Sequence, residues 1–298
     1  MMKTLRTPDE RFNVLIDFLY EPRYQEVDGI RIHYIDEGIN DSEVVLLMHG
    51  EPSWSFLYRY MIPLLIDAGF RVVAPDLVGF GRSDKPTEQS DHTYRKHVDW
   101  MTKWLLSLDL RNITLFCQDW GSLIGLRVAI ENQDRFKRII LSNGGLPTGQ
   151  QRMSEAFSNW RELSRTMTDF SIPFIIQGGT TTKLSKEILK AYDAPFADDS
   201  FKAGARILPS LVPISPDDPE SEANMKSIEL FKKWEKPFLT AFSDSDPITK
   251  GGDKFWQELV PGAQNQNHIT IKGAGHFVQE DRGQEAAKTI IDFINGNP

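Results

Sequence analysis

Short continuous apolar runs alternate along this chain with segments in which apolar residues recur at helical spacing. Residues 44–48, 71–75 and 113–117 are runs of the kind that form strands buried on both faces of a sheet. Residues 93–108 instead predict an amphipathic helix, with one apolar side formed by Val98, Met101, Leu105 and Leu108. This alternation predicts an α/β fold with a mostly parallel central sheet flanked by helices and joined by right-handed crossovers.

The rest of the chain extends this pattern on both sides. Residues 24–35 are typical of a hairpin with Asp28-Gly29 as its tight turn, preceded by an arm of little regular structure over residues 1–22. Further strands are predicted at residues 138–142, 237–242 and 268–271. Further helices are predicted at residues 54–68, 221–234, 254–259 and 283–294.

Between residues 144 and 219 the pattern changes. Helix-like segments at 154–167, 185–192 and 200–208 follow one another there without a buried-strand run. We interpret this block as a helical cap inserted into the sheet domain. The predicted organisation is a core in two parts, residues 1–147 and 220–298, with the cap at residues 148–219.

The composition excludes several classes of protein. Apolar residues make up 40% of the 298 and charged residues 26%, as in globular proteins that bury a core. The net charge of −8 and the scattered Lys and Arg argue against binding to nucleic acid or to an anionic membrane. The single cysteine, Cys117, excludes an intrachain disulfide and a cysteine-based metal cage. Because we find neither a secretory signal nor a run of about 18 apolar residues, we expect a cytoplasmic protein.

The most informative stretch follows the apolar run 113–117, where Gln118-Asp119-Trp120-Gly121 leads directly into a helical pattern. Small residues two positions before and after Asp119 permit the tight strand-to-helix turn of a nucleophile elbow, which exposes the central side chain at a helix N-terminus. Taken alone, an Asp at this position is more typical of a helix N-cap. A carboxylate exposed there can also attack a carbon without help from a base.

Two later motifs favour the catalytic interpretation. Asp246 follows the strand predicted at 237–242, and His276 follows the last predicted strand. Nucleophile, acid and histidine therefore come in the chain order of α/β-hydrolases, each beyond the carboxyl end of a strand. Asp244 is the alternative acid, but we prefer Asp246 because Pro247 fits a loop that leaves the strand.

The turn His49-Gly50-Glu51-Pro52 adds a further element. The backbone N–H groups of Glu51 and Trp120 are placed to form an oxyanion hole. We assign His49 to structure, as a ring that ties strand ends together. The other histidines lie outside the strand-end positions and lack metal-ligand spacing, so we expect surface or packing roles for them and neither metal nor cofactor: His33, His92, His97 and His268.

Four motifs carry a resemblance to a known family. They are His49-Gly50-Glu51-Pro52-Ser53-Trp54, Asp76-Leu77-Val78-Gly79-Phe80-Gly81-Arg82-Ser83-Asp84, Gln118-Asp119-Trp120-Gly121 and Gly275-His276-Phe277-Val278-Gln279-Glu280. Through them the chain resembles the haloalkane dehalogenases of the α/β-hydrolase superfamily over essentially its whole length. It is similar to the subgroup with the triad acid at Asp246, because Glu51 follows His49-Gly50 and Ser142-Asn143-Gly144 offers no carboxylate.

The resemblance implies hydrolysis of a small halogenated aliphatic substrate to a primary alcohol, a halide ion and a proton. Asp119 would attack the halogen-bearing carbon, and water activated by His276, itself oriented by Asp246, would hydrolyse the alkyl-enzyme ester. The indole N–H groups of Trp120 and Trp160 would bind the halide. We further expect a monomer and a dry, apolar pocket, lined by Leu123, Phe157, Ile172 and Ile248.

Other interpretations of the same residues stay open at this point. An epoxide hydrolase shares the three catalytic residues but normally needs two cap tyrosines, and residues 148–219 contain only Tyr192. A haloacid dehalogenase of this fold would place Arg where Trp120 and Leu123 stand, and a coelenterazine-type luciferase follows the other acid placement. A non-catalytic binding protein of this fold typically loses a triad member, whereas all three are present here.

Overall fold

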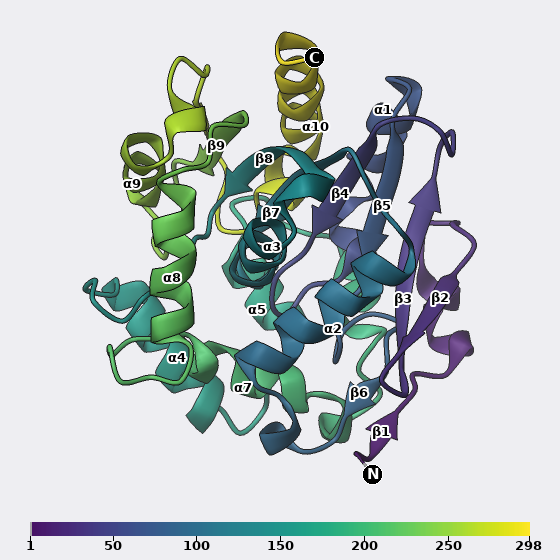
Figure 1. The fold of residues 1–298 in the computed structure, drawn as a ribbon. Helices are drawn as coiled ribbons and strands as arrows, with labels where there is room; N and C mark the ends of the chain where they lie inside the picture. The colour runs from purple at the N-terminus through teal and green to yellow at the C-terminus, as the bar shows by residue number, and fades with distance from the viewer. Residues whose placement is uncertain (1) are drawn as a thin grey trace.

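An eight-stranded sheet forms the centre of the computed structural model, which describes residues 2–298 and leaves Met1 outside (Figure 1). Its strands are β2 (Arg23–Val27), β3 (Ile30–Glu37), β4 (Val44–Met48), β5 (Arg71–Pro75), β7 (Ile113–Gln118), β8 (Phe136–Ser142), β9 (Phe238–Ser243) and β10 (Ile269–Ile271). Their order is β10-β9-β8-β7-β4-β5-β3-β2, and only β3 and β2 run antiparallel to their neighbours. The predicted mostly parallel sheet is confirmed.

Helices cover both faces of this sheet, which is why its central strands can be apolar throughout. Every residue of β4, β7 and β9 is buried. In Figure 1, α2 and α3 lie in front of the sheet and α10 behind it. The core helices are α1 (Ile62–Asp67), α2 (Tyr94–Ser107), α3 (Trp120–Glu131), α8 (Ser221–Phe231), α9 (Gly252–Leu259) and α10 (Val278–Gly296).

The largest departures from the predicted helix bounds are at α1 and α10. The segment predicted as one helix over residues 54–68 is a 3-10 turn at Ser55–Tyr58 followed by α1, because Pro63 is tolerated only in the first turn of a helix. α10 begins at Val278 rather than at residue 283, and it bends at Arg282, whose backbone is not helical. His276 therefore lies in the short turn between β10 and α10.

The chain between β8 and β9 is helical in the part that the structure describes, and we call residues 148–219 the cap. Its helices are α4 (Glu155–Thr166), α5 (Ile172–Gly178), α6 (Lys186–Asp193) and α7 (Ala203–Leu211). α4 packs on α7 and α5 packs on α6. Helix α5 was not predicted, since its seven residues are too few to show a helical period; the Ser171 hydroxyl caps it by accepting the Phe174 N–H at 3.4 Å.

The N-terminal arm is more ordered than predicted. β1 (Thr4–Leu5) pairs antiparallel with β6 (Lys85–Pro86), and a 3-10 helix follows at Asp9–Val14. The Thr7 hydroxyl donates to the Pro195 carbonyl at 2.5 Å. Because Pro195 belongs to the cap, the arm connects the cap to the edge of the core.

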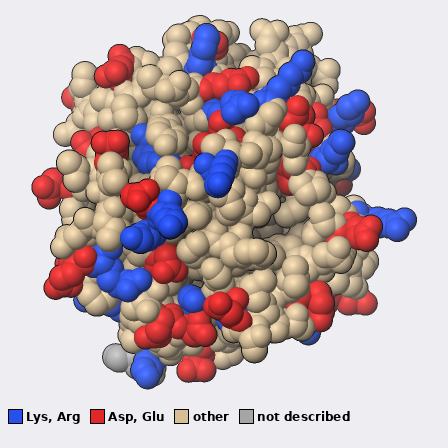
Figure 2. Space-filling model, turned by 180° about the vertical axis from the view of Figure 1, so that it is seen from behind, with Lys and Arg blue, Asp and Glu red and all other residues tan. Residues whose placement is uncertain are grey.

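Within residues 2–298, no helix is both long and apolar enough to cross a bilayer. On the face drawn in Figure 2, Lys and Arg are dispersed among Asp and Glu, and uncharged residues surround a hollow near its middle.

Candidate active site

Asp119 occupies the turn between β7 and α3. Its φ of 50° is unusual for a residue with a side chain, and the N–H of Asp119 is held by the Asn143 carbonyl at 3.0 Å. Two glycines make room for the turn. A Cβ at Gly121 would lie 2.0 Å from the Met48 carbonyl oxygen, and one at Gly50 would lie 2.3 Å from an Asp119 carboxylate oxygen. The strand, the turn and the helix thus form the predicted elbow.

The carboxylate of Asp119 faces the site and not its own helix. Although Asp119 stands at the N-cap position of α3, its side chain accepts no capping hydrogen bond. Its Oδ1 instead accepts the Glu51 N–H at 2.7 Å, and its Oδ2 lies 3.4 Å from Nε2 of His276. Trp120 is the first residue of α3, so its N–H has no carbonyl partner within the helix. The geometry thereby disfavours the helix-cap interpretation.

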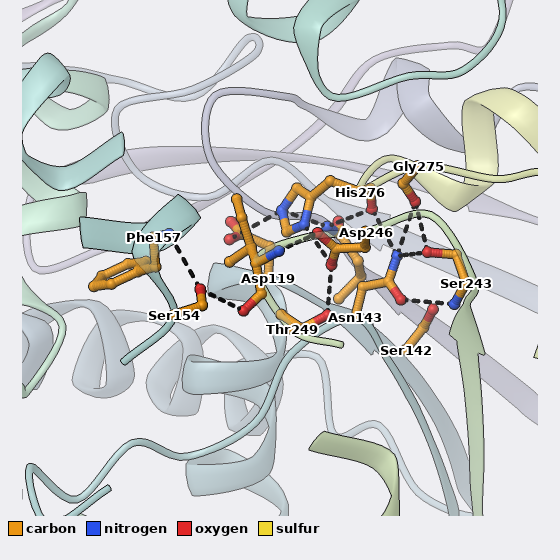
Figure 3. Close-up of polar contacts among 12 residues, drawn as sticks. Asp119, Ser142, Asn143, Ser154, Phe157, Ser243, Asp246, Thr249, Gly275 and His276 are labelled. Atoms are coloured by element: carbon orange, nitrogen blue, oxygen red, sulfur yellow. Dashed lines mark hydrogen bonds and ion pairs between the residues drawn. The ribbon is translucent and has the colours of Figure 1, made fainter. Parts of the chain in front are cut away.

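His276 lies between two carboxylates (Figure 3). Its Nδ1 is 3.0 Å from Oδ2 of Asp246, on the side opposite Asp119. Asp246 is held in turn by the Ile248 N–H at 2.9 Å and the Thr249 hydroxyl at 2.5 Å. The alternative acid, Asp244, is exposed and accepts the Gly273 N–H at 2.8 Å instead. The structure therefore brings Asp119, His276 and Asp246 together and leaves Asp244 outside.

This arrangement shifts the pKa values of both partners. Burial alone lowers the pKa of His276, but the carboxylates of Asp246 and Asp119 outweigh it and raise that pKa to about 10. Burial alone raises the pKa of Asp246, but His276 and the hydrogen bonds from Thr249 and Ile248 hold it below its ordinary value. At neutral pH His276 is thus an imidazolium, held between the side chains of Asp246 and Asp119.

A cavity of about 1050 Å³ opens above these residues between the core and the cap. Glu51, Asp119, Trp120, His276 and the cap residue Trp160 all line it. The indole of Trp120 packs edge-on against Tyr94, and the indole of Trp160 lies 6.0 Å from the Phe170 ring. Both predicted tryptophans are therefore in the cavity wall, one from each side.

Three of the four predicted pocket residues, Leu123, Phe157 and Ile248, line this cavity. The prediction for Ile172 is wrong. Ile172 and Ile176 are completely buried and share one side of α5, because residues four apart lie on one helix face. The neighbouring side of α5 meets the cavity instead, through Phe174, Ile175 and Gly178.

The remaining histidines lie outside the triad and form hydrogen bonds with neighbouring groups: His33 with Asp76, His92 with His97, and His268 with Thr240. Nε2 of His49 accepts the Leu77 N–H at 2.9 Å, and its Nδ1 lies 2.9 Å from the Gly50 carbonyl. The ring therefore ties the loops after β4 and β5 together. Across residues 2–298, the structure gathers no three His, Cys, Asp or Glu side chains in an arrangement that could hold a metal ion.

With this geometry established, comparison with known proteins places the chain. A model of the alpha/beta hydrolase fold matches residues 43–283. A haloalkane dehalogenase from Psychrobacter cryohalolentis is 53% identical to it over 100% of both chains. The chain belongs to the haloalkane dehalogenase family. A second dehalogenase, from Mycolicibacterium paratuberculosis, is 48% identical over 98% of both chains. The solved tetrameric haloalkane dehalogenase DpaA from Paraglaciecola agarilytica matches with a TM-score of 0.91 and 38% identity, over 97% of each chain.

In this dehalogenase, polar residues that the sequence analysis did not single out anchor the site. The Asn143 side-chain amide donates to the carbonyls of Gly275 and His276 at 3.1 and 3.0 Å and accepts the Ser243 N–H at 2.9 Å. Nε2 of Gln118 donates to the His276 carbonyl at 3.2 Å. Asn143 thus joins the ends of β8 and β9 to the histidine turn. The position of Asn143 directly after a predicted strand was the one feature of the sequence that could have indicated this role.

Proposed function

We propose that this dehalogenase hydrolyses small haloalkanes to primary alcohol, halide ion and proton, with Asp119 as the nucleophile. One observation carries the proposal. The Asp119 carboxylate does not cap its helix and instead lies at the cavity wall between the Glu51 N–H and the His276 ring. A carboxylate held in this way, with two indoles in the same wall, is suited to attack carbon and to release an anion.

In the first step an oxygen of Asp119 attacks the carbon that carries the halogen. The new C–O bond forms as the C–X bond breaks, the bonding pair leaves with the halide, and an alkyl ester of Asp119 results. The indole N–H groups of Trp120 and Trp160 receive the halide, because they donate hydrogen bonds without carrying a charge that would trap it. Exclusion of water by the apolar residues around them strengthens these interactions.

In the second step His276 acts as the base, and formation of the ester makes it able to accept a proton. Ester formation removes the negative charge of Asp119, which is one of the causes of the raised pKa of His276. The pKa therefore falls, the imidazolium gives up its proton, and His276 can take a proton from water that attacks the ester carbonyl. The N–H groups of Glu51 and Trp120 stabilise the oxyanion, an effect of about 3–4 kcal/mol for one donor in comparable sites. Asp246 orients the ring and stabilises the recharged imidazolium.

The overall reaction is tested by mixing the protein with 1-bromobutane and measuring the bromide and protons released. Both are expected in equal amounts, together with 1-butanol. Styrene oxide serves as the comparison substrate, because an epoxide hydrolase would turn it over instead. Diol formation from styrene oxide without bromide release from 1-bromobutane would contradict the proposal.

The structure gives a physical reason against the epoxide alternative. Tyr192 is the only tyrosine of the cap, and it is completely buried. Its hydroxyl donates to Glu280 at 2.5 Å, and Glu280 is also paired with Arg59. Burial and the neighbouring Glu280 raise the pKa of Tyr192 well above its ordinary value. The Tyr192 hydroxyl links the cap to the core through its hydrogen bond to Glu280, so it is not available to protonate an epoxide in the cavity.

The two candidate acids can be separated by matched substitutions. Asp246→Asn is expected to lower kcat for bromide release by about 10³- to 10⁴-fold, because an amide neither fixes the tautomer of His276 nor stabilises its charge. Asp244→Asn should leave kcat within about twofold, since Asp244 is exposed and does not contact His276. Steady-state kinetics on both variants checks this. A larger loss in the Asp244 variant would reassign the acid.

The cap at residues 148–219, the monomeric state and the cytoplasmic location remain part of the proposal. The related DpaA dehalogenase is tetrameric, so sedimentation velocity is the measurement that tests the monomer. No cofactor enters either step of the proposed reaction, because the nucleophile, the base and the halide donors all come from this chain.

A further inference from the structure

The side chain of Glu51 stands in the cavity wall without an assigned role, since the proposed reaction uses only its backbone N–H. The residue is 4% exposed, and its Oε1 is shielded from solvent and has no hydrogen-bond partner among residues 2–298. No Lys or Arg in that range pairs with it, although the other buried glutamate, Glu280, is paired with Arg59. A buried carboxyl group without a cation requires an explanation.

The surroundings of Glu51 determine its charge. Burial first, and then the negative charge of Asp119, raise the pKa of Glu51 well above its ordinary value, against the opposing effects of His276 and of a hydrogen bond from the Trp160 indole. Burial, the lack of a Lys or Arg partner and the nearby Asp119 carboxylate all favour the neutral carboxylic acid form of the group. A neutral acid has an O–H that can donate, whereas a carboxylate can only accept.

The position of this O–H beside Trp160 relates it to the halide. Trp160, whose indole N–H is proposed to bind the halide, lines the same cavity as Glu51 and is one of the groups that shift the pKa of Glu51. A halide that takes up the Trp160 N–H therefore lies next to Glu51. An ionised Glu51 would repel that halide and compete for the N–H, while a protonated Glu51 offers a further donor.

We propose that the side chain of Glu51, as a neutral carboxylic acid, donates a hydrogen bond to the leaving halide together with Trp120 and Trp160. The proton stays on Glu51 throughout. As the halide leaves carbon, the Trp160 N–H and the Glu51 O–H both turn to the same ion. The inference rests on the proposed dehalogenase function and assigns it a third halide donor.

Bromide titration without substrate tests the proposal, with quenching of tryptophan fluorescence as the signal and pH varied from neutral to alkaline. In the wild type, bromide affinity should fall by about tenfold for each pH unit above the pKa of Glu51, because one proton is linked to binding. Asp119 and His276 are the other titratable groups that face Glu51, and His276 also loses its proton towards pH 10. The contribution of Glu51 is therefore the difference between wild type and Glu51→Gln.

Glu51→Gln keeps an N–H donor at this position, so its bromide affinity at pH 7 should stay within about threefold of wild type while its alkaline decline becomes smaller. Glu51→Leu removes the donor and should weaken bromide binding by about tenfold at pH 7. Glu285→Gln, which removes an exposed carboxylate on α10 that does not line the cavity, is the charge-matched control and should follow the wild-type curve. Thermal unfolding shows which variants fold. Glu51→Asn, with the same amide on a shorter side chain, replaces Glu51→Gln if the latter does not fold.

The outcomes separate the inference from the function on which it rests. Superimposable pH curves for wild type and Glu51→Gln, or unchanged bromide affinity in Glu51→Leu, would overturn the role of Glu51 while leaving the halide site intact. Absence of bromide quenching in the wild type at every pH would overturn the halide site itself and this inference with it.

Discussion

Asp119→Ala is expected to lower bromide release from 1-bromobutane by at least about 10⁴-fold, to the level of the uncatalysed reaction. The size of the effect follows from the mechanism, because no other group in the site can form the ester and the remaining residues act only on it. His276 is a base for water, and the halide donors stabilise an anion that no longer forms. Bromide release under saturating substrate is the measurement.

The Asp119→Ala variant must keep its fold and its halide site for this result to be informative. The side chain makes no capping bond to α3, so its removal should not unfold the helix. Bromide should still quench the fluorescence of the variant, and its binding should be tighter than in wild type, because a nearby negative charge has been removed. Appreciable bromide release by a folded variant that still binds bromide would mean that water attacks the substrate directly.

Much of the fold could be predicted because its signals are local. The continuous apolar runs of β4 and β7 and the periodicity of α2 depend only on neighbouring residues, and their bounds agree with prediction to within one residue. Helix α5 was not predicted because it has only seven residues, too few to show a helical period in the sequence. A helix this short depends on packing for its stability. The inward face of α5 depends on contacts with distant elements, so Ile172 was wrongly placed in the cavity wall.

In the candidate site, too, the features that depend on nearby sequence were predicted and those that depend on distant contacts were not. Asp119, Asp246 and His276 each follow the carboxyl end of a strand, and the carboxyl ends of parallel strands lie at one edge of the sheet. The contacts that support these three residues depend instead on parts of the chain that are far apart in the sequence. Asn143 joins segments 100 and more residues away, and the neutral state of Glu51 depends on burial and on the charge of Asp119. Such properties belong to the folded site and have no signature in a single sequence.

The same charges explain why the two steps of the reaction can be separated by one substitution. Replacing His276 with Phe removes the base but leaves Asp119 and the halide donors in place. The first step should therefore proceed once in each molecule, releasing one equivalent of bromide, while hydrolysis of the ester stops. Loss of the imidazolium also removes the cation beside Asp119, so the carboxylate is free to attack. The ester is expected to accumulate because water has no base to activate it.

Intact-protein mass spectrometry after incubation of His276→Phe with 1-bromobutane should detect the trapped ester as a mass increase equal to one butyl group in place of a proton. Peptide mapping should locate the group on Asp119. The double variant His276→Phe with Asp119→Ala is the matched control and should show no adduct. A folded His276→Phe variant that releases bromide continuously would show that another group activates water. A folded His276→Phe variant that releases no bromide and carries no butyl group would show that Asp119 does not attack carbon. That result would contradict the two-step mechanism.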